Sequence, residues 1–204
     1  MQKNEQHPYD QRLARILVTP FAKSSLHPNH LTLICLLLGL SAAVMFISVN
    51  QSMYGFAALI YMLAVFTDHL DGELARMSGK ISNFGDKFDY IVGGLNYTML
   101  FISLGIGLFK IYGDWALILG FCAGLSNPII LILRMKMDTI FGKEAVKHPS
   151  ITGFEIEDAI YLIGPIIWFS KTIFFFVPYA LGTIGYLIWT IWQYFQWQKI
   201  KNNQ

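Results

Sequence analysis

The chain has 204 residues, of which 54% are hydrophobic and 14% are charged, with a net charge of +2 and a mean hydropathy of +0.47. Soluble domains carry roughly 25% charged residues, so this composition excludes a disordered chain, a coiled coil and an ordinary soluble enzyme. The near balance of 15 basic and 13 acidic residues, with no single basic patch, argues against a nucleic-acid partner. The sequence therefore predicts an all-α integral membrane protein that crosses the bilayer several times.

Residues 1–30 are polar and mixed, and they form the predicted cytoplasmic or interfacial segment. Within this segment, residues 9–19 read as a short amphipathic helix that ends before Pro20. Apolar side chains lie on one side of this helix and basic ones elsewhere: Leu13, Ile16 and Leu17 against Arg12 and Arg15. A helix of this kind lies in the membrane interface, and the alternative is an ordinary soluble linker.

A transmembrane helix needs about 20 mainly apolar residues, and six stretches without a formal charge are candidates. They are residues 31–49, 53–67, 90–109, 115–133, 159–170 and 172–198. The second and fifth are too short unless they extend into charged sequence. The second must continue to Asp68 and Asp71. The fifth must begin near Phe154 and so include Glu155, Glu157 and Asp158. Charges at membrane depth are costly, so they should face a wet cavity that marks function.

Lys and Arg are unevenly distributed between the two sides that these six spans define. Thirteen fall in the N-terminal segment, the loops after the second and fourth spans and the C-terminal tail, whereas only Lys110 and Lys171 fall on the other side. The positive-inside rule then predicts that both termini are cytoplasmic. The short loops fit a single membrane domain over residues 1–204, in the plasma membrane of a bacterium.

Acidic residues are concentrated where the second span ends and the third begins. Asp68 and Asp71 are three residues apart and so point to one side of a helix. Gly72, Ala75 and Arg76 fall on the same face, within an arc of about 140°. This face carries two carboxylates, two very small residues and one guanidinium group.

The third span begins with two further carboxylates, Asp86 and Asp89. Carboxylates from two adjacent helix ends can hold hard divalent cations such as Mg²⁺ or Mn²⁺, and two such metals can clamp the oxygens of a phosphoryl displacement. Small residues leave room for a ligand against the helix backbone, and Arg76 suits bidentate contact with phosphate. The alternative is a set of interfacial charges in which the acids pair with Arg76, Lys80 and Lys87.

These residues form a longer pattern with fixed spacing, in the order Asp68, Asp71, Gly72, Ala75, Arg76, Gly85 and Asp89. The pattern resembles the signature of the CDP-alcohol phosphatidyltransferases. The six-span layout and the Pro28-Asn29 entry to the first span are also similar to that family, so the resemblance covers most of the chain.

The resemblance implies attack by an alcohol hydroxyl on the phosphorus that bears the lipid or alcohol group, with release of CMP. The residues implied to bind the metals are Asp68, Asp71 and Asp89. The residues implied to contact the CDP group are Gly72, Ala75 and Arg76. Members of the family are commonly homodimers, so a homodimer is expected here.

The sequence departs from the family pattern at its last position. The family has a fourth Asp four residues after the third, assigned as general base, and this chain has Gly93 there. The acceptor proton then needs another base. Glu157 and Asp158 enter the fifth span from the same side of the membrane and are candidates, with a metal-bound hydroxide as the alternative. The predicted catalytic residues are therefore Asp89, Glu157 and Asp158.

Three further features each have two interpretations. Arg134, at the membrane end of the fourth span, either receives an acidic acceptor such as a sugar phosphate or serves topology and anionic lipid contact. Gly120 and Gly124 form a small-xxx-small pattern that is either a dimer contact or an internal one. Cys35 and Cys122 lie deep in apolar runs, where buried small hydrophobes are expected rather than ligands.

The sequence thus predicts a transferase of phospholipid biosynthesis that uses a CDP-alcohol donor, CDP-diacylglycerol first, and an acceptor hydroxyl. At least one of the two substrates is a lipid, and membrane lipids are further partners. The alternative is a catalytically impaired relative that binds a nucleotide-lipid or a partner protein without turnover. A small transporter fits less well, because the carboxylates cluster at one membrane face whereas transport sites lie near the midplane.

Overall fold

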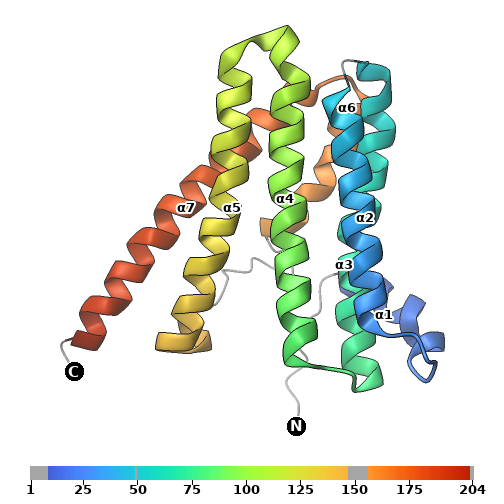
Figure 1. The fold of residues 1–204 in the computed structure, drawn as a ribbon, viewed down its shortest axis with the longest axis vertical. Helices are drawn as coiled ribbons and strands as arrows, with labels where there is room; N and C mark the ends of the chain where they lie inside the picture. The colour runs from blue at the N-terminus through green and yellow to red at the C-terminus, as the bar shows by residue number, and fades with distance from the viewer. Residues whose placement is uncertain (1–8, 49, 147–155, 203–204) are drawn as a thin grey trace.

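The computed structural model describes residues 9–48, 50–146 and 156–202, and the side chains of residues 9–11, 143–144 and 156–158 fall outside that description. Within these ranges every regular element is a helix and none is a strand, as Figure 1 shows. The prediction of an all-α protein is confirmed.

The elements follow one another along the chain with short connections. The first are α1 (Tyr9–Val18), η1 (Thr19–Phe21), α2 (Pro28–Ile47) and η2 (Gln51–Met53). Three long helices follow: α3 (Tyr54–Ser78), α4 (Asn83–Tyr112) and α5 (Asp114–Phe141). The last are η3 (Lys143–Val146), η4 (Ile156–Leu162), α6 (Ile163–Trp168) and α7 (Thr172–Asn202).

Among the described residues, five helices are long and apolar enough to cross a membrane, and the chain is an integral membrane protein. They are Pro28–Ile47, Gln51–Ser78, Asn83–Tyr112, Asp114–Phe141 and Thr172–Asn202. The fifth expected span corresponds to a shorter apolar stretch, Ala159–Trp168, which by itself does not cross a hydrocarbon core of roughly 30 Å. The count of six spans therefore stays a prediction. The expected extension of the second span is confirmed, because α3 continues through Asp68 and Asp71.

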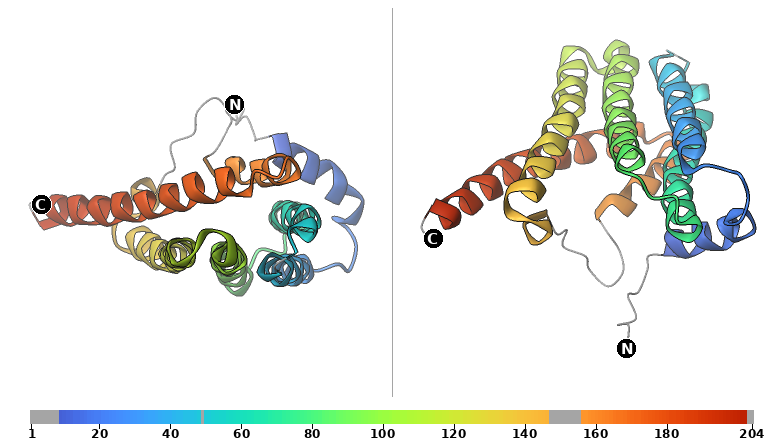
Figure 2. Two further views of the ribbon diagram at one scale, coloured as in Figure 1. Left: turned by 90° about the horizontal axis from the view of Figure 1, so that it is seen from above. Right: turned by 60° about the horizontal axis from the view of Figure 1, so that its bottom comes forward.

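The helices are arranged as a ring in which each packs on its neighbours in the order α3, α2, α4, α5, α7, α6 and back to α3. Seen from above, α2, α4 and α5 form a row and α7 lies along the other side (Figure 2). Figure 1 places α1, the turn between α3 and α4 and the C-terminal end of α7 at one end of the bundle. Segments that are predicted to be cytoplasmic thus share one end of the bundle.

The turn between α3 and α4 is set by local sequence. Gly79 ends α3 with a φ of +68°, a left-handed conformation that glycine adopts without strain. Ser82 caps the N-terminal end of α4, and its Oγ accepts a hydrogen bond from the Gly85 backbone N–H at 3.0 Å. Lys80 donates to two backbone carbonyls of the segment before α2, at 2.9 Å each. Residues 79–82 therefore bring the C-terminal end of α3 beside the N-terminal end of α4.

Glycines let α4 and α5 approach each other closely. A Cβ atom at Gly120 would lie 2.6 Å from the carbonyl oxygen of Phe101 and 2.8 Å from the Cα atom of Gly105. One turn further along α5, a Cβ atom at Gly124 would lie 3.0 Å from the carbonyl oxygen of Thr98. The small-xxx-small pattern of α5 is therefore an internal helix contact in this chain, which decides between the two interpretations.

The helix expected near the N-terminus is present as α1 and packs against α3. Its buried side chains are Ala14 and Val18, whereas Leu13, Ile16 and Leu17 are exposed. An exposed apolar stripe beside the bundle fits a helix that lies in the membrane interface. That position relative to the membrane stays a prediction.

The prediction that both cysteines are buried is confirmed for Cys35 and wrong for Cys122, which is exposed on α5. The physical reason is that the outer surface of a membrane helix faces lipid, which is as apolar as the protein interior. Hydrophobicity of the sequence therefore does not separate the two environments.

Replacing Gly120 with Ala should lower the free energy of unfolding by about 1–3 kcal/mol, the usual range for over-packing a well-filled contact. Gly182→Ala is the matched control, because a Cβ atom at that position of α7 meets nothing within 4 Å. Thermal unfolding in detergent, followed by tryptophan fluorescence, should show a lower Tm for G120A alone. Equal Tm values for the two variants would contradict a close α4–α5 contact.

Candidate active site

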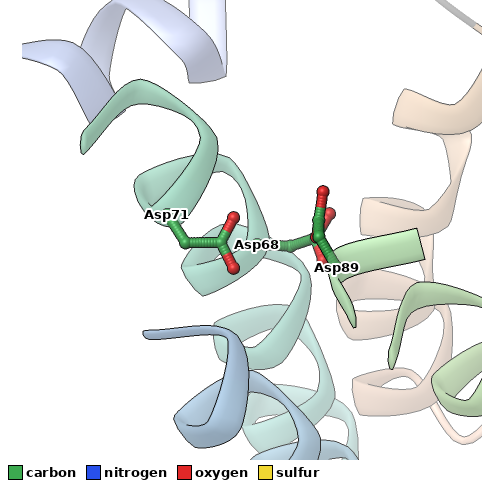
Figure 3. A group of neighbouring side chains, drawn as sticks. All are labelled: Asp68, Asp71 and Asp89. Carbon is green, nitrogen blue, oxygen red and sulfur yellow. The ribbon is translucent and has the colours of Figure 1, made fainter. Parts of the chain in front are cut away.

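Three of the predicted carboxylates meet between the C-terminal half of α3 and the N-terminal part of α4. Asp68, Asp71 and Asp89 each offer a carboxylate oxygen, and these oxygens all lie within 4.8 Å of one another. Figure 3 shows Asp68 of α3 facing Asp89 of α4, with Asp71 one turn further along α3. Asp71 is buried, and the other two are half-buried. The three-residue spacing on α3 and the short turn into α4 together produce this acidic cluster.

The acidic cluster suits a hard divalent cation. Carboxylate oxygens are the ligands that Mg²⁺ prefers, at about 2.0–2.1 Å, so opposite ligands of one ion stand about 4.2 Å apart. The oxygens of the acidic cluster all lie within 4.8 Å of one another, an upper bound only slightly greater than that spacing. Three carboxylates near one another in a membrane bundle repel each other strongly, and a cation removes that repulsion. The residues present therefore fit the metal that the sequence pattern implies.

Helix α2 contributes hydrogen-bond donors to the acidic cluster. Thr32 Oγ1 donates to Asp71 Oδ2 at 2.6 Å, and Cys35 Sγ lies 3.8 Å from Asp68 Oδ1 as a donor. Sequence reasoning missed Thr32 and treated Cys35 only as a small hydrophobe. Both residues precede their partners by more than 30 positions, and spacing within one helix cannot reveal contacts of that range.

The small-residue face of α3 carries the arginine expected to contact phosphate. Arg76 lies over Gly72, where a Cβ atom would be 3.5 Å from the guanidinium nitrogens. Arg76 Nη2 donates to Glu73 Oε1 at 2.7 Å, and the side chain of Arg76 is 53% exposed while that of Glu73 is 4% exposed. Ala75 is half-buried on the same helix. Glu73 thus anchors an arginine that remains accessible, a role that the sequence interpretation did not assign.

Other predicted residues do not join the acidic cluster. Asp86 is exposed at the start of α4 and is absent from the group of three carboxylates. A Cβ atom at Gly93 would meet nothing within 4 Å, so the position of the missing fourth carboxylate is open space. Glu157 and Asp158 belong to η4, but their side chains lie outside the described residues, and their role as base stays a prediction.

Arg134 is engaged within the protein. Its Nη1 donates to Tyr186 Oη at 2.6 Å and its Nη2 donates to the backbone carbonyl of Val146. The residue is 4% exposed, and its guanidinium carbon lies 5.7 Å from the centre of the Tyr186 ring. These contacts connect α5 to η3 and α7. Contact with an acidic acceptor stays a prediction.

The fold and site together define an integral membrane protein with an acidic cluster beside an accessible arginine. The model of the family described as "CDP-alcohol phosphatidyltransferase" matches residues 25–194, and the chain belongs to that family. The family depends on divalent metal, which agrees with an acidic cluster at the matching positions.

Two curated relatives are similar to parts of the chain. The archaetidylinositol phosphate synthase of Pyrococcus horikoshii is 36% identical over 97 residues, which are 48% of this chain and 50% of that protein. An uncharacterized protein of Aquifex aeolicus is 30% identical over 135 residues, which are 65% of this chain and 66% of that protein. The chain thus matches about half the length of the first relative and about two thirds of the second.

Tyr186→Phe should lower the free energy of unfolding by about 1–3 kcal/mol, because it removes an acceptor from a buried charged donor. The control is Tyr194→Phe, also in α7, whose hydroxyl accepts from Gln198 in an exposed hydrogen bond and whose loss should change stability by less than about 0.5 kcal/mol. Chemical or thermal unfolding of both variants in detergent measures the difference. Similar stabilities would show that the Arg134 contact contributes little.

Proposed function

We propose that this protein transfers a phosphoalcohol or phosphatidyl group from a CDP-alcohol, first of all CDP-diacylglycerol, to an acceptor hydroxyl in phospholipid biosynthesis. The observation that carries the proposal is the convergence of Asp68, Asp71 and Asp89 beside Arg76 in a chain of this family. The acceptor oxygen forms a bond to the phosphorus that bears the alcohol group. The bond from that phosphorus to the CMP oxygen breaks, CMP leaves with the electron pair, and the hydroxyl proton passes to a base.

The acidic cluster is the proposed site of Mg²⁺ or Mn²⁺. When bound, the metal supplies positive charge that stabilises the negative charge developing on the phosphoryl oxygens. Asp68, Asp71 and Asp89 would hold the cation. Arg76 pairs with the donor diphosphate, held over Gly72 by Glu73, while the small side chain of Ala75 leaves the helix surface open.

The proposed base is Glu157 or Asp158, because Gly93 supplies no carboxylate. Both residues stand at the start of the segment that leads into α6, and α6 packs on α3. Asp89 is the third residue of the proposed catalytic set, and it acts as a metal ligand in the acidic cluster. The open space at Gly93 also supports the second candidate function, a relative that binds a nucleotide-lipid or partner protein without turnover.

Several further properties belong to this proposal. The protein is proposed to act as a homodimer in a bacterial plasma membrane, with both termini and the active site on the cytoplasmic side. The Pyrococcus relative is by name a synthase of archaetidylinositol phosphate. An inositol phosphate is therefore the first acceptor to test, followed by other sugar phosphates and glycerol phosphate.

Purified protein in lipid should release CMP from CDP-diacylglycerol when Mg²⁺ or Mn²⁺ and a mixture of these acceptors are present, and release should stop in chelator. Asp89→Asn should reduce the rate by at least about 100-fold because it removes a charged ligand from the acidic cluster. Asp86→Asn, three residues earlier on α4 and exposed, should retain most activity. Nucleotide binding without CMP release, for soluble CDP-alcohols as well, would favour the binding role.

The base assignment has its own test. The double variant Glu157→Gln/Asp158→Asn should lower kcat by roughly 100-fold or more, the usual contribution of a general base. Adding Gly93→Asp to that double variant should restore at least about 10-fold, because a side chain at position 93 enters open space. Gly93→Asn is the matched control and should restore nothing. Full turnover by the double variant would exclude both residues as the base.

A further inference from the structure

One face of α2 lies against the acidic cluster. Thr32, Cys35 and Gly39 are spaced by three and four residues, so they share this face. Thr32 is 2% exposed and Cys35 is 1% exposed. Both are therefore covered by α3 and α4, the two helices that carry the carboxylates. Helix α2 has no charged residue between 31 and 47, and the sequence predicts no site residue on it.

The hydroxyl of Thr32 has one proton and two acceptors within reach. Its distance to Asp71 Oδ2 is 2.6 Å, and its distance to the Pro28 carbonyl oxygen is 3.4 Å. The shorter contact has the length of a charge-assisted hydrogen bond, so the proton is donated to the carboxylate. A threonine that only satisfies its own helix donates at normal length to the carbonyl oxygen four residues earlier, as Thr190 does to that of Tyr186 at 2.8 Å.

Cys35, on the same face of α2, makes a second contact with a carboxylate of α3, that of Asp68. Asn96 Nδ2 donates to Cys35 Sγ at 3.1 Å, and Cys35 in turn lies within donor distance of Asp68. A Cβ atom at Gly39 would overlap the side-chain oxygen of Asn96. Because Gly39 has no side chain, the Asn96 amide has room to lie against α2 and to donate to Cys35. Helix α2 thus contacts both carboxylates of α3.

We propose that Thr32 is a positioning residue, which fixes the carboxylate of Asp71 in the orientation that binds a divalent cation. The inference rests on the metal site of the proposed function. An aspartate without this bond is free to rotate about its side-chain torsions, and three carboxylates in one cluster drive each other apart. A donor on a neighbouring helix opposes that movement, and loss of such outer contacts commonly weakens metal binding by 10–100-fold.

The test compares Thr32→Val, which keeps the shape and removes the donor, with Thr32→Ser, which keeps the donor. The probe is Mn²⁺ alone, titrated into purified full-length protein in detergent, with free Mn²⁺ measured by electron paramagnetic resonance. Thr32→Val should raise the Kd for Mn²⁺ by about 10–100-fold, and Thr32→Ser should stay within about 3-fold of the unmodified protein. Thr190→Val is the matched control, a buried threonine of α7, and should leave the Kd unchanged.

A merely structural role for Thr32 is separated by a double-variant cycle. If Thr32 acts through Asp71, then Thr32→Val should have little further effect on Mn²⁺ binding in an Asp71→Asn background. Thermal unfolding without metal checks that each variant folds, and Thr32→Ala replaces T32V if that variant does not. An unchanged Kd in T32V, or a Kd in T32S as weak as in T32V, overturns the inference. Unmodified protein that binds no Mn²⁺ overturns the proposed metal site and this inference together.

Discussion

The structure depends on the placement of three carboxylates at one end of an apolar helix bundle. Charged groups at such a depth are expensive unless neighbouring groups compensate them. Asp68, Asp71 and Asp89 lie together, and α2 supplies donors to the first two. The close grouping of α2, α3 and α4 follows from this requirement, because a carboxylate of α3 or α4 that moved away would lose its partners.

Close helix contacts maintain this grouping. Lipid is as apolar as a protein core, so membrane helices associate through packing and hydrogen bonds rather than through the hydrophobic effect. Gly39 admits Asn96 between α2 and α4, and Gly105 meets Gly120 between α4 and α5. Helix α4 is therefore held on both sides along its length. The position of Asp89, near the N-terminal end of α4, therefore depends on contacts beside the acidic cluster, at Asn96, and on more distant ones, at Gly105.

Gly93 places no carboxylate at the position where the family pattern has its fourth Asp. The three remaining carboxylates still converge, and Arg76 remains both anchored and accessible. Nothing fills the space that a side chain at Gly93 would take. In the proposed function, the residues that would bind the metal and the diphosphate are therefore separate from the residue that would accept the proton.

The sequence alone determined the helical membrane class, because long apolar runs without charge have few other structures. It also determined the face shared by Asp68 and Asp71, since helical periodicity is local. Helical periodicity does not predict contacts between residues far apart in the sequence, and the tertiary structure decided these. They are the hydrogen bond from Thr32 to Asp71, across 39 positions, and the contact of Gly120 with Gly105 of α4. The tertiary structure also placed Cys122 on the outer surface. Lipid and protein core present the same polarity to a side chain, so only the packing of helices distinguishes them.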